Sequence, residues 1–353
     1  MKVFFWVSVA AVVYVYLGYP VLLGLARRVA RKPVWKAPIE PTVTILIAAH
    51  NERERIERKL RNCIELDYPR NKLQILVSLD GPSDGTEFAV WRFAARGVQM
   101  LHSREHRGKP SALNAGIRRA AGDIVVFADV RQMFDRHAIR RLVENFADPG
   151  VGAVSGELIL TGGPHSESAS GVGLYWKYEK WIRSRESDVH SVAGATGAIY
   201  AIRRELYREL PDETILDDVM TPMRIVFGGK RVVFEPLAKA YDAVSCCPRA
   251  EFGRKVRTLT GNYQLVALMP ELLIPFRNPV FWQFCSHKLG RLVVPHLLIG
   301  ILVSNVFLIG GIYTWLLAAQ IVLYLAAWMG HVMANRSVIV PELLQVEEQR
   351  RAA

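Results

Sequence analysis

Acidic side chains follow two runs of β-forming residues, where they could bind the polar parts of a ligand. Asp80 comes directly after residues 73–79, and Asp129 comes directly after residues 123–128. Ligands of parallel α/β sheets bind in the crevice outside the carboxyl ends of the strands. We therefore expect both aspartates to lie at the ligand-binding edge of one sheet.

A lysine and a pair of adjacent acids stand before or at the start of two further expected helices. Lys109 lies in a Gly-Lys-Pro turn ahead of residues 111–121, where a cation suits an anionic phosphate. Asp217 and Asp218 open a helix that runs through Phe227. Adjacent acids at a helix start can be ordinary capping residues. A carboxylate beside a second carboxylate instead has a raised pKa, which suits a general base.

These residues are spaced along an alternation of expected strands and helices. Asn51 can cap the first helix, which carries Ile56, Leu60 and Ile64 at helical spacing. The alternation predicts an α/β domain with a largely parallel sheet. The expected strands are residues 43–49, 73–79, 98–101 and 123–128.

Missing glycine motifs disfavour a dinucleotide-binding fold and exclude a P-loop NTPase. The turn after the first expected strand reads His50-Asn-Glu-Arg, whereas a dinucleotide-binding fold needs GxGxxG there. No Walker A sequence occurs, so the chain is not a P-loop NTPase. The four cysteines show no CxxC spacing, which argues against a zinc site and a disulfide scaffold.

Apolar and charged residues are segregated along the chain, which is 51% hydrophobic and 22% charged. Residues 3–25 and 292–335 contain no Asp, Glu, Lys or Arg, and about 20 apolar residues span a bilayer. Gly310-Gly311 divides the second run into two spans. The alternatives are a signal peptide for the first run and a buried helical hairpin for the second.

The basic residues between Arg27 and Lys36 predict the orientation. By the positive-inside rule that side of the first span is cytoplasmic, and much of the +12 charge would face an anionic leaflet. The lipid bilayer is therefore the expected partner, and nucleic acid is not, because no nucleic-acid-binding motif occurs. We expect a membrane helix (1–26), a basic linker (27–41), a catalytic domain (42–270), an interfacial segment (271–290), two membrane helices (291–335) and a cytoplasmic tail (336–353).

Ordered motifs over about residues 42–265 resemble those of the family 2 glycosyltransferases. The resemblance implies an α/β GT-A fold, a Rossmann-like mixed or parallel sheet flanked here by transmembrane helices, and nucleotide-sugar donors. The motifs in chain order are Ile47-Ala-Ala-His-Asn-Glu52, Asp80-Gly-Pro-Ser-Asp-Gly-Thr86, Arg107-Gly-Lys-Pro-Ser-Ala-Leu-Asn114, Phe127-Ala-Asp129-Val-Arg131, Leu216-Asp217-Asp218 and Arg254-Lys-Val-Arg257-Thr258.

The resemblance implies a role for each matched position. Asp218 would be the general base and Asp217 its supporting acid, so the sugar would transfer in one displacement with inversion. Asp80 would accept a hydrogen bond from uracil or a similar base. The positions expected to bind the nucleotide sugar are Asn51, Glu52, Asp80, Lys109, Asp129, Arg131, Arg254 and Arg257.

The chain departs from the family pattern at two positions. Arg131 stands where the D-x-D motif has its second aspartate, and arginine cannot ligate a cation. Two interpretations are open. In the preferred one, a divalent cation, Mg²⁺ or Mn²⁺, is held by Asp129, water and another side chain such as Asp242. In the other, Arg131 itself neutralises the phosphate. Thr258 replaces the tryptophan of processive synthases, which leaves processive and single transfer both open.

The sequence as a whole predicts a multi-pass enzyme of the inner membrane with its catalytic domain in the cytoplasm. It would move a sugar from a UDP-sugar to a polysaccharide, oligosaccharide or lipid-linked acceptor, as in exopolysaccharide and cell-envelope synthesis, with synthase-complex or export proteins as partners. The alternatives are a polyprenyl-phosphate glycosyltransferase and an inactive nucleotide-sugar-binding subunit of a synthase complex.

Overall fold

The computed structural model describes residues 1–161, 171–243 and 248–351, and the chain forms two compact units. The helical unit comprises Met1–Tyr19, Ser245–Leu259 and Leu289–Ala353. The sheet unit comprises Pro20–Val244 and Thr260–Lys288. Two of the four cysteines, Cys246 and Cys247, lie outside the described residues.

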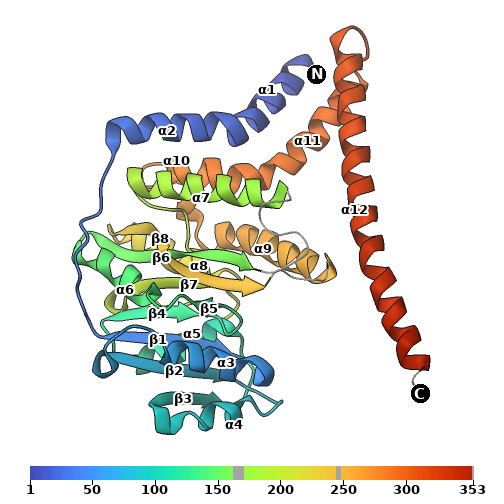
Figure 1. Cartoon of the computed structure of the whole chain (residues 1–353). Coiled ribbons are helices and arrows are strands. Elements are labelled where there is room, and N and C mark those ends of the chain that lie inside the picture. Colours follow the sequence, from blue (N-terminus) through green and yellow to red (C-terminus); the bar gives the residue numbers. More distant parts are fainter. Residues whose placement is uncertain (162–170, 244–247, 352–353) are drawn as a thin grey trace. The chain divides into compact units, whose positions relative to one another are not determined.

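The sheet unit is built on an eight-stranded mixed sheet with the order β3-β2-β1-β4-β7-β6-β8-β5 (Figure 1). The first four of these strands are parallel, as the sequence predicts, while β7 runs antiparallel to both β4 and β6. The strands are β1 (Val43–Ala49), β2 (Leu73–Asp80), β3 (Val98–Ser103), β4 (Ile124–Ala128), β5 (Met133–Phe134), β6 (Val151–Thr161), β7 (Ile199–Arg203) and β8 (Arg231–Ala243).

The centre of the sheet is buried on both faces. Ile45, Leu46 and Ile47 are consecutive in β1 and fully buried, although successive side chains in a strand point to opposite faces. Val43 pairs with Leu73 of β2 on one side and with Ile124 of β4 on the other. This register brings the ends of β2 and β4, and therefore Asp80 and Asp129, to the same edge of the sheet.

Helices connect the strands of the sheet unit. In α3, Ile56 and Leu60 are fully buried and Ile64 is partly buried, which confirms the helical spacing read from the sequence. The helices are α3 (Arg53–Ile64), α4 (Thr86–Trp91), α5 (Lys109–Arg119), α6 (Ala138–Val143), α7 (Gly171–Val189) and α8 (Asp217–Phe227).

The expected cap of α3 by Asn51 is wrong. Glu52 is the residue that precedes the helix, and its side chain makes no capping hydrogen bond. The first N–H of the helix, that of Arg53, instead donates to Oδ2 of Asp84 at 3.0 Å. Asn51 has a left-handed backbone, with φ of 52°, and its side-chain Oδ1 instead accepts a hydrogen bond from the Ser83 N–H at 2.8 Å. The side chain therefore braces the loop after β2, because the long-range partner competes with the local one.

Three helices in the described residues are long and apolar enough to cross a membrane: Lys2–Ala30, Phe281–Val306 and Ile312–Gly330. The first contains α1 (Lys2–Val13) and α2 (Tyr19–Ala30), and the second contains α10 (Phe281–Gln283) and α11 (Gly290–Val306). The third is part of α12 (Ile312–Arg351). Gly310 and Gly311 both have positive φ in the turn between α11 and α12, where the sequence predicts the break.

Two predicted boundaries differ from the observed helices. The helix that includes α11 already begins at Phe281, inside the segment expected to lie at the interface, because no Gly or Pro interrupts residues 281–289. Similarly, α12 continues to Arg351 through most of the expected tail.

Within the helical unit, α1 packs on α11 and α12. The ring of Phe5 meets the ring of Tyr313 edge to face, and Trp6 Nε1 donates a hydrogen bond to the Tyr313 hydroxyl.

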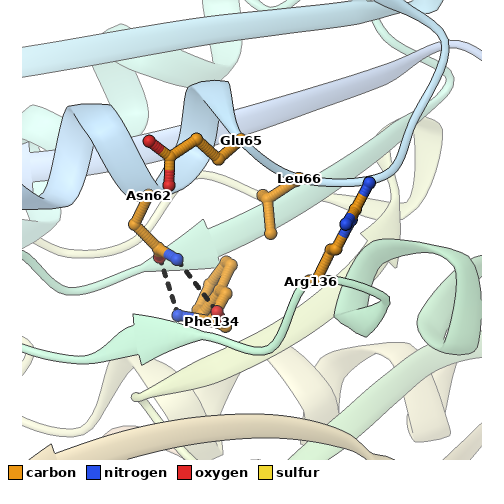
Figure 2. A pocket seen from close by; sticks show the side chains of 5 residues that line it. All are labelled: Asn62, Glu65, Leu66, Phe134 and Arg136. Atoms are coloured by element: carbon orange, nitrogen blue, oxygen red, sulfur yellow. Dashed lines mark hydrogen bonds between the residues drawn. The ribbon is translucent and has the colours of Figure 1, made fainter.

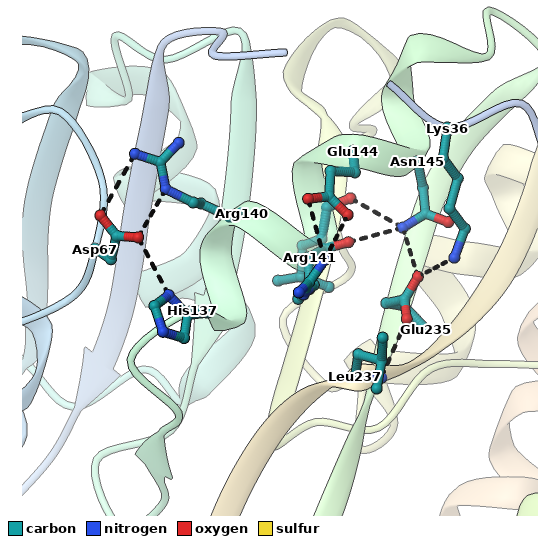
Figure 3. A network of polar contacts seen from close by, with 10 residues as sticks. Lys36, Asp67, His137, Arg140, Arg141, Glu144, Asn145, Glu235 and Leu237 are labelled. Atoms are coloured by element: carbon teal, nitrogen blue, oxygen red, sulfur yellow. Dashed lines mark hydrogen bonds and ion pairs between the residues drawn. The ribbon is translucent and has the colours of Figure 1, made fainter. Parts of the chain in front are cut away.

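The basic linker is bound to the sheet unit by ion pairs. Lys36 pairs with the buried carboxylate of Glu235, which also accepts a hydrogen bond from Asn145 (Figure 3). At the end of α2, Arg27 lies 2.5 Å and Arg31 lies 3.8 Å from the carboxylate of Asp188 on α7. These three cations therefore pair with acids of the protein, and the expectation that much of the basic excess faces the lipid leaflet stays a prediction.

Candidate active site

Lys109 is the centre of a charge cluster formed by three separate elements. Its Nζ lies 3.0 Å from Oδ1 of Asp129, at the end of β4, and 3.3 Å from Oδ1 of Asp217, at the start of α8. Burial lowers the pKa of Lys109, but the charges of Asp129 and Asp217 outweigh it and hold this pKa above its usual range. The structure thus brings three residues singled out from the sequence together around a permanent positive charge.

Asp218 points to the glycine-rich loop after α7. Its Oδ2 accepts a hydrogen bond from the Gly197 N–H at 3.0 Å, and its backbone carbonyl accepts one from the Ala195 N–H at 2.7 Å. A side chain at position 197 would place its Cβ only 3.1 Å from this Oδ2, so glycine permits the close approach. The structure therefore holds one carboxylate oxygen of Asp218 by the protein backbone.

The carboxyl group of Asp218 has a pKa raised to about 6. Burial is the largest cause, and the charge of neighbouring Asp217 adds to it, while the positive charges of Lys109 and Lys288 act in the opposite sense. A carboxylate with this pKa is ionised at neutral pH and basic enough to accept a proton from a hydroxyl group. The surroundings of Asp218 thus fit a general base.

Asp80 is buried at the end of β2 and holds the loop that leads to Lys109. Its Oδ1 accepts the Arg107 N–H and its Oδ2 accepts the Gly108 N–H, both at 2.8 Å, and His106 Nδ1 lies 2.7 Å from Oδ2. Gly81 makes this approach possible, because a Cβ there would lie 2.5 Å from the backbone nitrogen of His106. A carboxylate has about four acceptor positions. Three of them are used by these contacts, so one acceptor position of Oδ1 has no partner among the residues that the structure describes.

Two histidines beside Asp80 are absent from the residues singled out by sequence. The rings of His50 and His106 are stacked with their centroids 3.9 Å apart, and each Nδ1 lies within 3.3 Å of the Asp80 carbonyl oxygen. His50 stands in a family motif, but single histidines in loops carry no pattern that would reveal their pairing. The stacked rings offer an aromatic surface next to the expected base-binding aspartate.

The turn after β1 braces the loop after β2. Asn51 bonds to Ser83, and the backbone N–H of Glu52 donates to Oγ1 of Thr86 at 2.9 Å. The carboxylate of Glu52 pairs with Arg55 one helical turn later. These contacts are all internal, so nucleotide binding by Asn51 and Glu52 stays a prediction.

Arg131 pairs with the other expected metal ligand. Its Nη2 lies 2.5 Å from Oδ2 of Asp242, a buried residue on β8 that also accepts a hydrogen bond from Gln132. Within the described residues, no three or more His, Cys, Asp or Glu side chains gather in a group that could hold a metal ion. Mg²⁺ bound together with phosphates needs only one or two carboxylates. Asp129 fits that requirement, whereas Asp242 could contribute only its Oδ1, which has no partner among the described residues.

The arginines expected at the diphosphate lie on α9 (Pro248–Leu268), in the part of that helix that belongs to the helical unit. Arg254 is partly buried and Arg257 is exposed, and the two are three residues apart on the helix. Nucleotide binding by Arg254 and Arg257 stays a prediction.

A hollow of about 510 Å³ lies at the end of α3 and contains none of the predicted site residues (Figure 2). Its lining residues are Asn62, Glu65, Leu66, Phe134 and Arg136. The amide of Asn62 makes two hydrogen bonds to the backbone of Phe134, at 2.7 and 2.9 Å, and so ties α3 to β5. The amide group of Asn62 therefore connects two elements of the fold.

Comparison with known proteins agrees with the geometry. Residues 44–210 match the model of glycosyl transferase family 2. The chain is 27% identical over 236 residues to a poly-beta-1,6-N-acetyl-D-glucosamine synthase of Staphylococcus aureus, covering 64% of this chain and 55% of that protein. It is 25% identical over 246 residues to a probable glycosyltransferase, YdaM, of Bacillus subtilis, covering 66% and 59%. The chain thus spans little more than half the length of these curated relatives.

A solved structure matches almost the whole chain. The mannosyltransferase PcManGT from Pyrobaculum calidifontis, determined with GDP-Man and Mn²⁺, superposes with a TM-score of 0.73 and 26% sequence identity. The match covers 96% of this chain and 98% of that one. The mixed sheet, the acids at its carboxyl edge and these likenesses together show that the chain has a GT-A fold and contains a stretch, residues 44–210, that matches glycosyl transferase family 2.

Proposed function

We propose that the protein is a membrane-bound inverting glycosyltransferase that moves a sugar from a nucleotide sugar to a glycan or lipid-linked acceptor. The observation that carries this proposal is the position of Lys109 between Asp129 and Asp217, with Asp218 next in the chain. A permanent cation beside a base with a raised pKa meets the two needs of the reaction, which are a stabilised leaving diphosphate and an activated acceptor hydroxyl.

Lys109 would bind the diphosphate, helped by the N–H groups at the start of α5. Asp218 would take the proton of the acceptor hydroxyl, whose oxygen attacks the anomeric carbon of the sugar. The bond from that carbon to the diphosphate oxygen breaks, and the nucleoside diphosphate leaves with the electron pair. Because attack and departure occur on opposite faces, the anomeric configuration is inverted.

A divalent cation would add charge stabilisation at the leaving diphosphate, and Asp129 is the residue that would hold it. Arg131, which forms an ion pair with Asp242, supplies a second positive charge near the same edge of the sheet. Both interpretations of this altered motif therefore place positive charge where the diphosphate is expected.

The donor and acceptor classes rest on the relatives. UDP is the nucleotide that the family resemblance implies, while the solved mannosyltransferase was bound to GDP-Man, and one N–H acceptor position on Asp80 suits uracil and guanine alike. The named synthase of Staphylococcus aureus favours a polysaccharide acceptor. A lipid-phosphate acceptor is the second candidate, and an inactive binding subunit is the third, because Arg131 alters the D-x-D position.

A panel of radiolabelled UDP- and GDP-sugars incubated with membranes that contain the protein tests the proposal. We expect label from one donor to enter a product, and the product's size and extractability into organic solvent distinguish a polysaccharide from a lipid. Membranes without the protein are the control. Purified protein that binds a nucleoside diphosphate yet transfers and hydrolyses none of the sugars would support the inactive subunit instead.

Replacing Asp129 with alanine is expected to weaken nucleoside diphosphate binding about tenfold or more, and to remove any effect of EDTA on that binding. Its carboxylate would otherwise orient the donor or hold the cation beside the diphosphate. Titration of UDP and GDP by calorimetry with and without EDTA checks this, and Asp212→Ala, an exposed aspartate, is the control. Unchanged affinity in Asp129→Ala refutes the role, and full wild-type activity in EDTA assigns the charge to Arg131.

We propose an inner-membrane location with the amino terminus outside, the carboxyl terminus inside and residues 40–285 in the cytoplasm. A cysteine at Arg104, on an exposed loop of the sheet unit, is expected to resist a membrane-impermeant thiol reagent in intact cells. A cysteine at Ile309, in the turn between α11 and α12, is expected to react and serves as the positive control. Labelling of the Arg104→Cys protein in intact cells would overturn this topology.

A further inference from the structure

We propose that Arg183 on α7 is a positioning residue for the general base, acting through Ser155 and the loop of residues 194–197. This inference rests on the proposed function, because it presumes that Asp218 takes the acceptor proton. No sequence motif points to Arg183 or Ser155, and their connection to Asp218 is visible only in the structure.

The hydroxyl of Ser155 links Arg183 to the loop. Nη2 of Arg183 donates to Ser155 Oγ at 2.6 Å, and the backbone N–H of Thr196 donates to the same oxygen at 3.0 Å. The hydroxyl in turn donates to the carbonyl of Gly156 at 3.2 Å. A serine hydroxyl has two acceptor positions and one donor, so all three are used. Ser155 is fully buried, so no solvent can replace a lost partner.

The loop passes this constraint to Asp218. The residue after Thr196 is Gly197, whose N–H donates to Oδ2 of Asp218, and the residue before it is Ala195, whose N–H donates to the Asp218 carbonyl. Three successive backbone N–H groups are thus committed, two to Asp218 and one to Ser155. A shift of the loop toward or away from Ser155 would therefore change the hydrogen bond that orients the base.

Arg183 packs against an aromatic ring and carries charge close to the base. Its guanidinium lies 4.9 Å from the ring centroid of Phe234. Other contacts of α7 fix the same region, since Lys180 pairs with Glu157, two residues after Ser155 on β6. At its other end α7 carries Asp188, which pairs with Arg27. The helix therefore pairs with β6 through Lys180 and with α2 through Asp188.

The variants Ser155→Ala and Arg183→Gln test the inference against matched controls. Ser187→Ala removes another buried serine, whose Oγ accepts the Phe234 N–H at 2.9 Å, and Arg185→Gln removes a neighbouring arginine that lies over Trp181. We expect both test variants to keep the donor KM and to lose kcat about 10- to 100-fold, as misplacement of a catalytic group does. The controls are expected to keep both constants.

The pH profile gives a readout that loss of folding would not move. A hydrogen bond to a carboxylate lowers its pKa by about one unit, so a weakened Gly197 bond should shift the acid limb of kcat upward by about one pH unit. The charged groups that act on Asp218 are Asp217, Asp129, Lys109, Lys288 and Arg183, and Arg183→Gln also removes one of these positive charges. Ser155→Ala leaves every charge in place, so its shift reports the hydrogen bond alone.

The outcomes separate this inference from the proposed function. If Ser155→Ala and Arg183→Gln match their controls in kcat and acid limb while Asp218→Asn is inactive, the positioning role is wrong and the base assignment stands. If Asp218→Asn keeps the wild-type rate, the base assignment fails and this inference fails with it. Melting temperatures of all five variants show whether each is folded. If Arg183→Gln does not fold, the kcat and acid limb of Ser155→Ala, which removes only one oxygen atom, decide the outcome.

Discussion

Replacing Asp218 with asparagine is expected to lower kcat by at least about 100-fold, because general-base catalysis contributes about 10²–10⁴-fold. Donor binding should persist, since the base acts on the acceptor hydroxyl and the charge of Lys109 stays in place. Nucleotide titration checks the donor binding and the transfer rate checks the loss of kcat, both measured on the same preparation. Asp212→Asn, an exposed aspartate five residues before the site, is the control and should behave as wild type.

The same variant distinguishes a base from a helix cap through its stability. The folded pKa of Asp218 lies above its unfolded value, so the native state binds more protons between these values and loses stability as pH rises through about 6. Asparagine removes this penalty, and the variant should melt at the same or a higher temperature at pH 7.5. A capping acid would instead cost about 1 kcal/mol on removal and leave transfer largely intact.

The wild-type rate should follow the ionisation of Asp218. Above about pH 6 the base is deprotonated and kcat should level off, while below it log kcat should fall by about one for each pH unit. Wild-type transfer by Asp218→Asn, or a flat wild-type profile between pH 5 and 7, would contradict the assignment.

Replacing Lys109 with glutamine is expected to weaken donor binding about 10- to 100-fold, the usual contribution of a hydrogen bond to a charged group. The variant also leaves Asp129, Asp217 and Asp218 without their shared cation. Because the charge of Lys109 lowers the pKa of Asp218, its loss should move the acid limb of kcat to higher pH. The melting temperature should fall as well, since these three neighbouring acids would repel one another without the cation.

The control for this prediction is Lys72→Gln, which removes a lysine that pairs with Glu40 at 3.4 Å on the surface. Surface pairs contribute about 0–1 kcal/mol, so donor binding and the pH profile should not change. Titration of the donor and kcat across pH measure both variants. Donor affinity and an acid limb in Lys109→Gln equal to those of Lys72→Gln would show that Lys109 has no part in the site.

Much of the fold could be predicted from the sequence because its elements carry strong local patterns. The apolar runs at residues 43–49, 73–79 and 123–128 became β1, β2 and β4, and their parallel register brings Asp80 and Asp129 to one edge. The antiparallel placement of β7 between β4 and β6 is a long-range property that no local pattern encodes. The cap by Asn51 was wrong for the same reason, since Ser83 is 32 residues away.

In the candidate site, too, the sequence motifs indicate single residues, whereas the contacts between them depend on the fold. Lys109, Asp129 and Asp217 each stand in a recognisable motif, but their mutual contact needs the fold. The pairing of Arg131 with Asp242 joins residues 111 positions apart, and the path from Arg183 through Ser155 to the loop before Asp218 joins three elements. The stack of His50 on His106 likewise depends on two loops meeting, so neither ring could be assigned from its own neighbourhood.

The anomeric configuration of the product tests the central claim most directly. With the donor identified by the panel, nuclear magnetic resonance of the newly formed linkage compares its configuration with that of the sugar in the donor. Direct attack by an acceptor deprotonated at Asp218 requires inversion, so an α-linked donor should give only β-linked product. A product that retains the donor's configuration would contradict the single displacement and the role of Asp218 in it.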